Sequence, residues 1–237
     1  MGLSRGLQRC FPAIFLLAAA WAQSPTKPES NSELNHLLSQ MDRTAANFRT
    51  TQADFIWDQY QKVVDETDEQ KGMVYFRRVS NETQMAADIT EPAPQKYLLF
   101  TDSKIQVYQV RIDQVTTYNA GKDRASFESF LVLGFGGSGQ EMLKSFDVKY
   151  LGSEKVGDLE TAKLELVPKS EKVRNVFNRI WLWIDPSRGV SVQQQLFAPD
   201  GDYRLAKYSE IQLNQKIPDG VFKLKTTSKT KFVSPQG

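Results

Sequence analysis

The stretch GMVYFRR, residues 72–78, is apolar on both of its faces and ends in two arginines. Because side chains alternate along a strand, Val74, Phe76 and Arg78 share one face. The stretch IWLWI at residues 180–184 is apolar throughout. An antiparallel sheet with one face in water should instead alternate apolar and polar residues. These strands therefore predict a sheet that is covered on both faces, by helices or by a ligand.

The same period of two recurs along most of the chain and predicts an all-antiparallel series of strands. Turn signals separate the strands at residues 65–69, 91–94, 101–103 and 199–202. The strands are expected at residues 53–64, 72–78, 83–89, 96–101, 105–110, 115–118, 147–151, 162–167, 180–184, 190–197, 203–213 and 222–227.

Helices are expected in two places. Before the strands, apolar residues from Leu34 to Phe48 recur at spacings of three and four, which predicts an amphipathic helix that starts at a capping box at Ser30. Short helices at residues 127–133 and 140–146 flank a glycine-rich segment, and Ser138 begins a second capping box. The pattern indicates a mainly β (α+β) fold, a curved antiparallel sheet or incomplete barrel with helices against its concave face.

Residues 1–22 have the features of a cleaved signal peptide. Arg5 and Arg9 precede a short apolar run, and Ala20-Trp21-Ala22 forms a small-x-small cleavage site. Cys10, the only cysteine, precedes that run and is expected to leave with the signal. The mature chain, residues 23–237, is then expected to be a single soluble domain outside the cytoplasm, without a thiol.

Composition argues against several classes of function. Lys and Arg total 30 and Asp and Glu total 28, so the chain lacks the strong basic field of a nucleic-acid-binding protein. With one Cys and one His, neither a zinc site nor most catalytic constellations can be assembled. His36 lies off the apolar stripe of its helix, which favours a solvated surface position. We therefore expect no enzyme, no cofactor, no metal and no nucleic-acid partner.

The two-faced strands indicate a lined apolar cavity. Its expected lining includes Phe55, Trp57, Val74 and Phe76, together with Trp181 and Trp183. For the strand at residues 180–184, the sequence does not decide which of its two faces lines the cavity. Arg78 is the polar member of this group. Its guanidinium either extends to water from the strand end or, on a concave face, donates to backbone carbonyls of a covering helix.

Several short motifs are similar to those of the LolA-type periplasmic lipoprotein carriers. Residues 72–78 resemble that family's G-x-L-W-x-K-R strand, and Phe48 to Phe55 followed by Gln59 resembles its F-x-x-x-F-x-Q segment with a longer spacing. Residues 164–169 and 217–222 resemble its x-P-K strand end and an I-P-D-x-x-F motif. The chain departs from the family pattern at Val79, where proline is common, and in its glycine-rich segment at residues 134–139.

The resemblance implies an incomplete barrel with short lid helices, and a monomeric periplasmic chaperone in protein transport. Such a carrier shields the acyl chains of lipoproteins and ferries them from the inner to the outer membrane. Its donor is an inner-membrane lipoprotein-releasing ABC transporter, and its acceptor is an outer-membrane lipoprotein receptor. The family's lid-bonding arginine matches Arg78. A lipid-binding or sensor module of the same fold and a secreted hydrolase stay open as alternatives, and so does a free lipid as the cargo.

Overall fold

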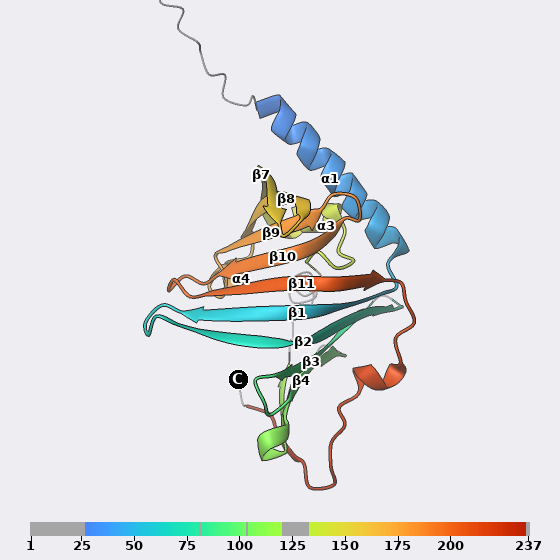
Figure 1. Cartoon of the computed structure of the whole chain (residues 1–237), viewed down its shortest axis with the longest axis vertical. Coiled ribbons are helices and arrows are strands. Elements are labelled where there is room, and N and C mark those ends of the chain that lie inside the picture. Colours follow the sequence, from blue (N-terminus) through green and yellow to red (C-terminus); the bar gives the residue numbers. More distant parts are fainter. Residues whose placement is uncertain (1–26, 81, 103, 120–132, 236–237) are drawn as a thin grey trace, which may run out of the picture.

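The computed structural model describes residues 27–80, 82–102, 104–119 and 133–235. The expected signal peptide at residues 1–22, with Cys10, lies outside the described residues, as does the part of the expected helix at 127–132. The described chain begins with helix α1 (Lys27–Asn47), which leads directly into the first long strand (Figure 1).

Twelve strands follow in the described residues, interrupted by short helices. The helices are η1 (Val110–Ile112), α3 (Gly139–Ser145), α4 (Glu171–Arg174) and η3 (Asp219–Phe222). The strands are β1 (Thr50–Gln61), β2 (Glu66–Val79), β3 (Glu82–Glu91), β4 (Lys96–Thr101), β5 (Lys104–Gln109), β6 (Gln114–Asn119), β7 (Phe146–Val156), β8 (Leu159–Pro168), β9 (Arg179–Asp185), β10 (Val190–Phe197), β11 (Tyr203–Leu213) and β12 (Lys231–Val233).

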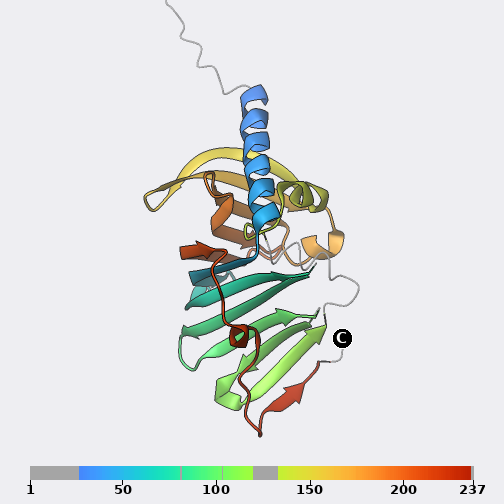
Figure 2. The ribbon, with the colours of Figure 1, turned by 90° about the vertical axis from the view of Figure 1, so that its right-hand side faces the viewer.

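All twelve strands belong to one open sheet, in the order β12-β6-β5-β4-β3-β2-β1-β11-β10-β9-β8-β7. Every neighbouring pair is antiparallel except β12 and β6, which run parallel. The sheet is strongly curved, and α1 crosses the strands of its β7–β10 half (Figure 2). The expected mainly β fold, with an N-terminal helix against a curved antiparallel sheet, is confirmed.

Several predicted local features differ from the structure, and residues 62–64, predicted to end the first strand, form a turn. The acidic residues 66–69 begin β2 instead of forming a turn, because the β1–β2 hairpin continues in register to the pair Gln61 and Glu66. Helix α1 begins at Lys27, so Ser30 lies inside the helix rather than at its cap. Residues 222–227 form no strand, because this segment crosses the sheet's outer face instead of running along it. The capping box at Ser138, in contrast, is confirmed.

The covering of both sheet faces, expected from the two-faced strands, is also confirmed for β2. On the inner face, Val74 and Phe76 are buried in a cluster with residues of β1, β3, β4 and the glycine-rich segment. On the outer face, Tyr75 packs against the C-terminal segment, whose Ile217 and Phe222 are buried there. Burial of both faces explains why this strand does not alternate between apolar and polar residues.

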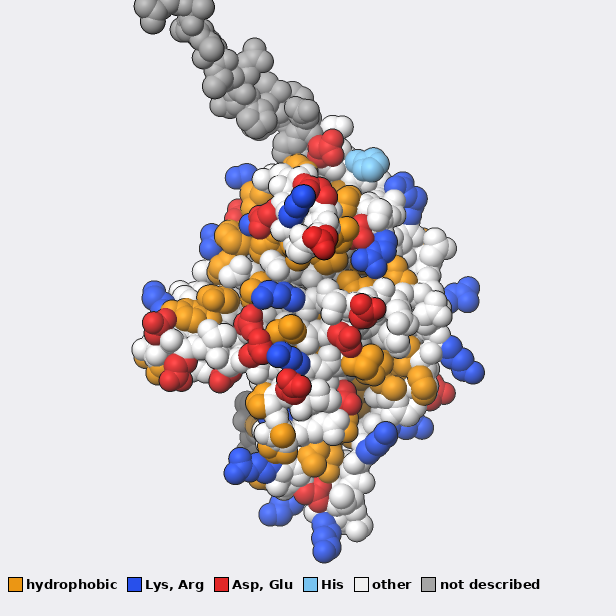
Figure 3. Space-filling model, viewed as in Figure 1, with side chains coloured by type: hydrophobic (Ala, Val, Ile, Leu, Met, Phe, Trp, Pro, Cys, Tyr) orange, Lys and Arg blue, Asp and Glu red, His pale blue; other side chains and the backbone are white. Residues whose placement is uncertain are grey.

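The surface carries charges of both signs. On the face shown in Figure 3, Lys and Arg side chains are scattered among Asp and Glu. The sole histidine, His36, is exposed on α1, as its helical phase predicts. Among the described residues, no helix combines the length and the apolar character that crossing a membrane requires.

Candidate functional site: the concave face and its covering loop

Strand register defines one continuous inner face of the sheet. Leu182 of β9 lies opposite Gln194 of β10, Gln194 opposite Ala206 of β11, and Ala206 opposite Trp57 of β1. Directly opposite residues in a sheet point to the same face. Because Leu182 packs against α1, this face is the one that the helix covers.

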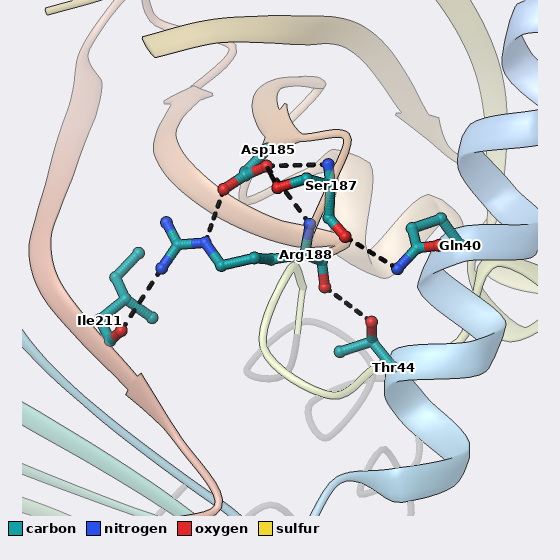
Figure 4. Close-up of polar contacts among 6 residues, drawn as sticks. All are labelled: Gln40, Thr44, Asp185, Ser187, Arg188 and Ile211. Carbon is teal, nitrogen blue, oxygen red and sulfur yellow. Dashed lines mark hydrogen bonds and ion pairs between the residues drawn. The ribbon is translucent and has the colours of Figure 1, made fainter. Parts of the chain in front are cut away.

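The half of this face near β7–β10 is closed by α1 and α3. Leu37, Leu38 and Met41 of α1 are at most 3% exposed and pack on Leu164 and Leu182 of the sheet. The turn between β9 and β10 adds polar contacts, shown in Figure 4. Gln40 Nε2 donates to the Ser187 carbonyl at 3.0 Å, and Thr44 Oγ1 donates to the Arg188 carbonyl at 2.6 Å. Helix α1 is thus held by both apolar burial and hydrogen bonds.

The turn itself is organised by Asp185, a residue that is only 3% exposed. Its carboxylate accepts hydrogen bonds from the backbone and hydroxyl of Ser187 and from the backbone and guanidinium of Arg188. Burial acts to raise the pKa of Asp185, but these hydrogen bonds outweigh it and hold the pKa below its usual value. The carboxylate therefore stays ionised. It holds in place the Ser187 and Arg188 carbonyls, which accept the hydrogen bonds from α1.

The other half of the face is aromatic. Phe55, Trp57, Val74 and Phe76, all expected to line a cavity, lie together there and are each at most 8% exposed. The rings of Phe55 and Trp57 stack with centroids 3.9 Å apart. These four residues form the centre of what we call the aromatic face.

Residues Leu133–Ser138, which we call the plug loop, cover the aromatic face. Phe135 is 1% exposed and stacks on Phe76 with centroids 5.1 Å apart. The loop is tied to β10, since Gln194 Nε2 donates to the Leu133 carbonyl at 2.6 Å. Gly136 has φ +85°, and an added Cβ would lie 2.5 Å from the Phe48 ring, so the loop needs glycine at this point.

Arg78 connects α1 to the plug loop. One terminal nitrogen, Nη1, donates to the Ala45 carbonyl in the last turn of α1 at 2.9 Å. The other, Nη2, donates to the Gly136 carbonyl at 2.9 Å. Arg78 lies at the rim of the inner face, where it is exposed to solvent. Its two-pronged guanidinium suits such bridging because it presents several donors in fixed directions.

A cavity of about 820 Å³ opens beside this bridge. Ala45, Arg78, Gly136, Met142 and Phe146 contribute to its walls. Its size is within the range of ligand pockets, and it borders both the plug loop and the end of α1. The aromatic face behind it is occupied by the protein's own side chains, chiefly Phe135.

Trp181 and Trp183 are not part of the aromatic face. They alternate with Ile180, Leu182 and Ile184, which pack under α1, so both tryptophans point to the outer face. There the Lys163 ammonium lies 4.3 Å and 4.6 Å from their ring centroids. This placement corrects the expectation that the two tryptophans line the same cavity as Val74 and Phe76, because the concave side of β9 is the one with the aliphatic residues.

Two features of the site were not anticipated from the sequence. Phe135 was not singled out, although an aromatic residue between Gly134 and Gly136 is a local signal for a ring presented by a tight loop. Arg77, the neighbour of Arg78, faces outward as strand alternation predicts, but its ion pair with Asp219 at 2.6 Å has no signal in the sequence. Its guanidinium lies 4.1 Å from the Phe222 ring centroid, so Arg77 holds the C-terminal segment rather than the plug loop.

Comparison with known proteins bears on this arrangement. Over residues 46–225 the sequence matches the family described as outer membrane lipoprotein carrier protein LolA. The matched region runs from the end of α1 past η3 and so contains Arg78 and the plug loop. None of the curated proteins matches the chain significantly.

Solved structures with a similar fold share little sequence with the chain. An uncharacterized conserved protein from Thermus thermophilus has a TM-score of 0.52 at 10% identity, over 87% of this chain and 99% of that one. A LolA superfamily protein from Nitrosomonas europaea has a TM-score of 0.41 at 14% identity, over 81% and 97%. A putative outer membrane lipoprotein-sorting protein domain from Vibrio parahaemolyticus has a TM-score of 0.45 at 9% identity, over 81% and 97%.

The Thermus structure supports the fold alone, whereas the family match covers well over half of the sequence, including the strand that ends in Arg78. The chain belongs to the LolA family of outer membrane lipoprotein carrier proteins.

Proposed function

We propose that this protein is a periplasmic carrier that shields the acyl chains of lipoproteins on its aromatic face and ferries them from the inner to the outer membrane. The observation that carries the proposal is the Arg78 bridge, which ties the plug loop to α1 over that face. An inner-membrane lipoprotein-releasing ABC transporter is the proposed donor, and an outer-membrane lipoprotein receptor is the proposed acceptor. The family match supports this role.

Acyl chains need such shielding because exposing them to water is costly. Each CH₂ group that is removed from water contributes about 0.8 kcal/mol. In the proposed loaded state the plug loop moves aside, and acyl chains take the place of Phe135 against Phe55, Trp57, Val74 and Phe76. In this proposal, an acyl chain makes the contacts that Phe135 makes in the closed state.

Release follows from competition between the plug loop and the cargo. A carrier that binds cargo only in its open state loses apparent affinity in proportion to the population of its closed state. The Arg78 hydrogen bonds stabilise that closed state. The bridge therefore weakens cargo binding enough for handover without any energy source in the carrier.

The test is the retention of cargo by Arg78→Leu. A hydrogen bond to a charged group contributes about 1.5–3 kcal/mol, so losing one shifts the open–closed equilibrium by about ten-fold or more. We expect Arg78→Leu to bind an acylated lipopeptide more tightly than wild type and to release it more slowly to outer-membrane vesicles. For Arg78→Lys, whose side chain has a single compact ammonium group, the affinity and the release rate should lie between those of wild type and Arg78→Leu.

Arg77→Leu is the matched control, because it makes the same change on the same strand but on the outer face. It should lower stability through loss of the Asp219 contact while leaving cargo release as in wild type. Equal release by wild type and Arg78→Leu would reject the proposed role of the bridge. Failure of wild type to bind any acylated ligand would reject the carrier function itself.

A further inference from the structure

A second arginine, Arg204 of β11, lies on the concave side of the sheet. It alternates with Leu205 and lies two residues before Ala206, which belongs to the buried cluster of the aromatic face. Its direct partners across the sheet are Leu196 of β10 and Gln59 of β1. Neither partner carries a charge.

The guanidinium of Arg204 has no counter-ion within the described parts of the chain. Its Nε is buried and makes no hydrogen bond, and no carboxylate among the described residues forms an ion pair with it. Its one ring contact is weak, with the Trp57 centroid 5.9 Å from Cζ. Burial lowers the pKa of Arg204, and an arginine nevertheless keeps its proton in proteins. Among the described residues, the site therefore holds a partly desolvated positive charge that no carboxylate compensates.

The groups around Arg204 are hydrogen-bond donors. Trp57 Nε1 is buried and has no acceptor in hydrogen-bonding geometry. Burial raises the pKa of Tyr208 to about 12, although the Trp57 N–H and the Arg204 charge act in the opposite direction, so its phenol keeps its proton at neutral pH. Arg204, the Trp57 N–H and the Tyr208 hydroxyl thus lie close together on the inner face, and within the described parts of the chain no anionic group accepts from them.

The plug loop covers the Tyr208 ring of this cluster. The Phe135 ring meets the Tyr208 ring edge-on, with centroids 4.7 Å apart. The same ring stacks on Phe76 of the aromatic face. Movement of Phe135 would therefore uncover the donor cluster and the apolar surface beside it in one step.

We propose that Arg204, Trp57 and Tyr208 bind the oxyanion of an anionic lipid, a carboxylate or phosphate attached to an acyl chain, while the chain lies on the aromatic face. The inference rests on the proposed carrier function and adds a free anionic lipid to the lipoproteins as a class of cargo. Arginine binds both oxyanions with two parallel N–H···O bonds, and such charge-assisted bonds are stronger where water is excluded. The bound oxyanion would also remove the cost of the uncompensated charge.

The test compares ligands that share a twelve-carbon chain and differ in their headgroup: dodecanoate, dodecyl phosphate and dodecanol at pH 8. Binding to the full mature chain is followed by tryptophan fluorescence and calorimetry. We expect wild type to bind the two anionic ligands at least about ten-fold more tightly than dodecanol, because a charged hydrogen bond contributes that much. Acetate and inorganic phosphate, which lack the chain, should not compete.

Arg204→Met should remove this preference and bind the three ligands alike, whereas Arg204→Lys should keep part of it. Without ligand, Arg204→Met should unfold at the same temperature as wild type or higher, because the substitution removes an unpaired buried charge. The control is Arg179→Met on the outer face. There the Arg179 Cζ atom lies 4.3 Å from the Phe197 ring centroid. This variant should bind all three ligands as wild type does.

The outcomes separate this inference from the carrier function. Equal binding of dodecanol and the anionic ligands by wild type would overturn the inference and leave the carrier standing. The inference would also be overturned if Arg204→Met weakened all three ligands equally, if it lowered the unfolding temperature, or if inorganic phosphate bound as well as dodecyl phosphate. Binding of none of the three ligands would overturn this inference, and the carrier function would fall with it only if the acylated lipopeptide also failed to bind.

Discussion

Arg77 and Arg78 are neighbours in β2 and bind segments on opposite faces of the sheet. Arg78 donates to carbonyls of α1 and of the plug loop on the inner face, while Arg77 holds Asp219 and Phe222 of the C-terminal segment on the outer face. The separation follows from the pleat of the strand, which sends successive side chains to opposite faces. The end of β2 thereby holds α1 and the plug loop on the inner face and the C-terminal segment on the outer face.

At the same scale, Asp185 predicts a pH dependence. We expect Asp185→Asn to lower the free energy of unfolding by about 1–3 kcal/mol at neutral pH, because the carboxylate that organises the β9–β10 turn is lost. The folded-state pKa of Asp185 is depressed, so its stabilising effect is present above the unfolded pKa of about 4 and is lost as pH falls through the folded pKa.

The measurement is urea unfolding of wild type and Asp185→Asn between neutral pH and about pH 3. The gap in stability between the two should shrink as the pH falls below about 4. Asp158→Asn, in the exposed turn between β7 and β8, is the control and should keep a constant difference from wild type. A constant gap for Asp185→Asn as well would show that its charge does not stabilise the turn.

At the scale of elements, α1 and the plug loop are held differently. Helix α1 buries an apolar stripe and donates hydrogen bonds to the β9–β10 turn. The plug loop is held by two buried side chains, Leu133 and Phe135, by two hydrogen bonds to β10 and by the Arg78 bridge. Opening the plug loop therefore sacrifices fewer contacts than lifting α1. We expect the loop to be the part that moves when cargo binds.

Phe135→Ala tests this expectation. Loss of its two aromatic contacts, which contribute about 0.5–1.5 kcal/mol each, should weaken the closed state and tighten binding of an acyl probe by about five-fold or more. The unfolding temperature of the unliganded protein should fall. Both are measured by fluorescence, with probe titration and thermal unfolding.

Phe100→Ala is the matched control, since Phe100 is equally buried in the same cluster but comes from β4 of the sheet. It should lower stability and also weaken probe binding, because it removes part of the surface that the acyl chain contacts. If Phe135→Ala weakened binding in the same way, the ring would belong to the binding surface and not to a movable cover.

On the scale of the whole molecule, the sheet is open and has two edge strands, β7 and β12. Exposed edges invite pairing with other chains. In β7, the register shift between Tyr150 and Gly152 and the lysines at 149 and 155 counter such pairing. At the other edge, the chain covers β6 with its own short C-terminal strand, β12.

Deleting residues 231–237 should therefore expose the edge of β6. We expect the truncated chain to self-associate with rising concentration in size-exclusion chromatography, while its free energy of unfolding changes by no more than about 1 kcal/mol, as for other surface changes. Phe232→Ala, which alters a 66% exposed side chain but keeps the backbone pairing, should elute as wild type does. Identical elution of all three proteins would contradict the edge-protection role of β12.

Local pattern was enough to predict much of this fold. The bounds expected for β4, β10 and β11 agree with the structure to the residue, because period-two alternation and turn residues act over a few neighbouring positions. The sharing of one face by Val74, Phe76 and Arg78 follows from the same alternation. These features depend only on the geometry of a strand.

What the sequence by itself determined, then, is which residues share a face and where most strands begin and end. Which face is concave was decided only when α1 packed on Leu182, and this packing placed Trp181 and Trp183 outside. Tertiary packing also decided that residues 222–227 cross the outer face and that Phe135 covers the inner one. It left the Arg204 Nε buried without a hydrogen bond from the described residues. The physical reason is that alternation constrains neighbours along one strand, whereas curvature and covering depend on contacts between segments far apart in the chain.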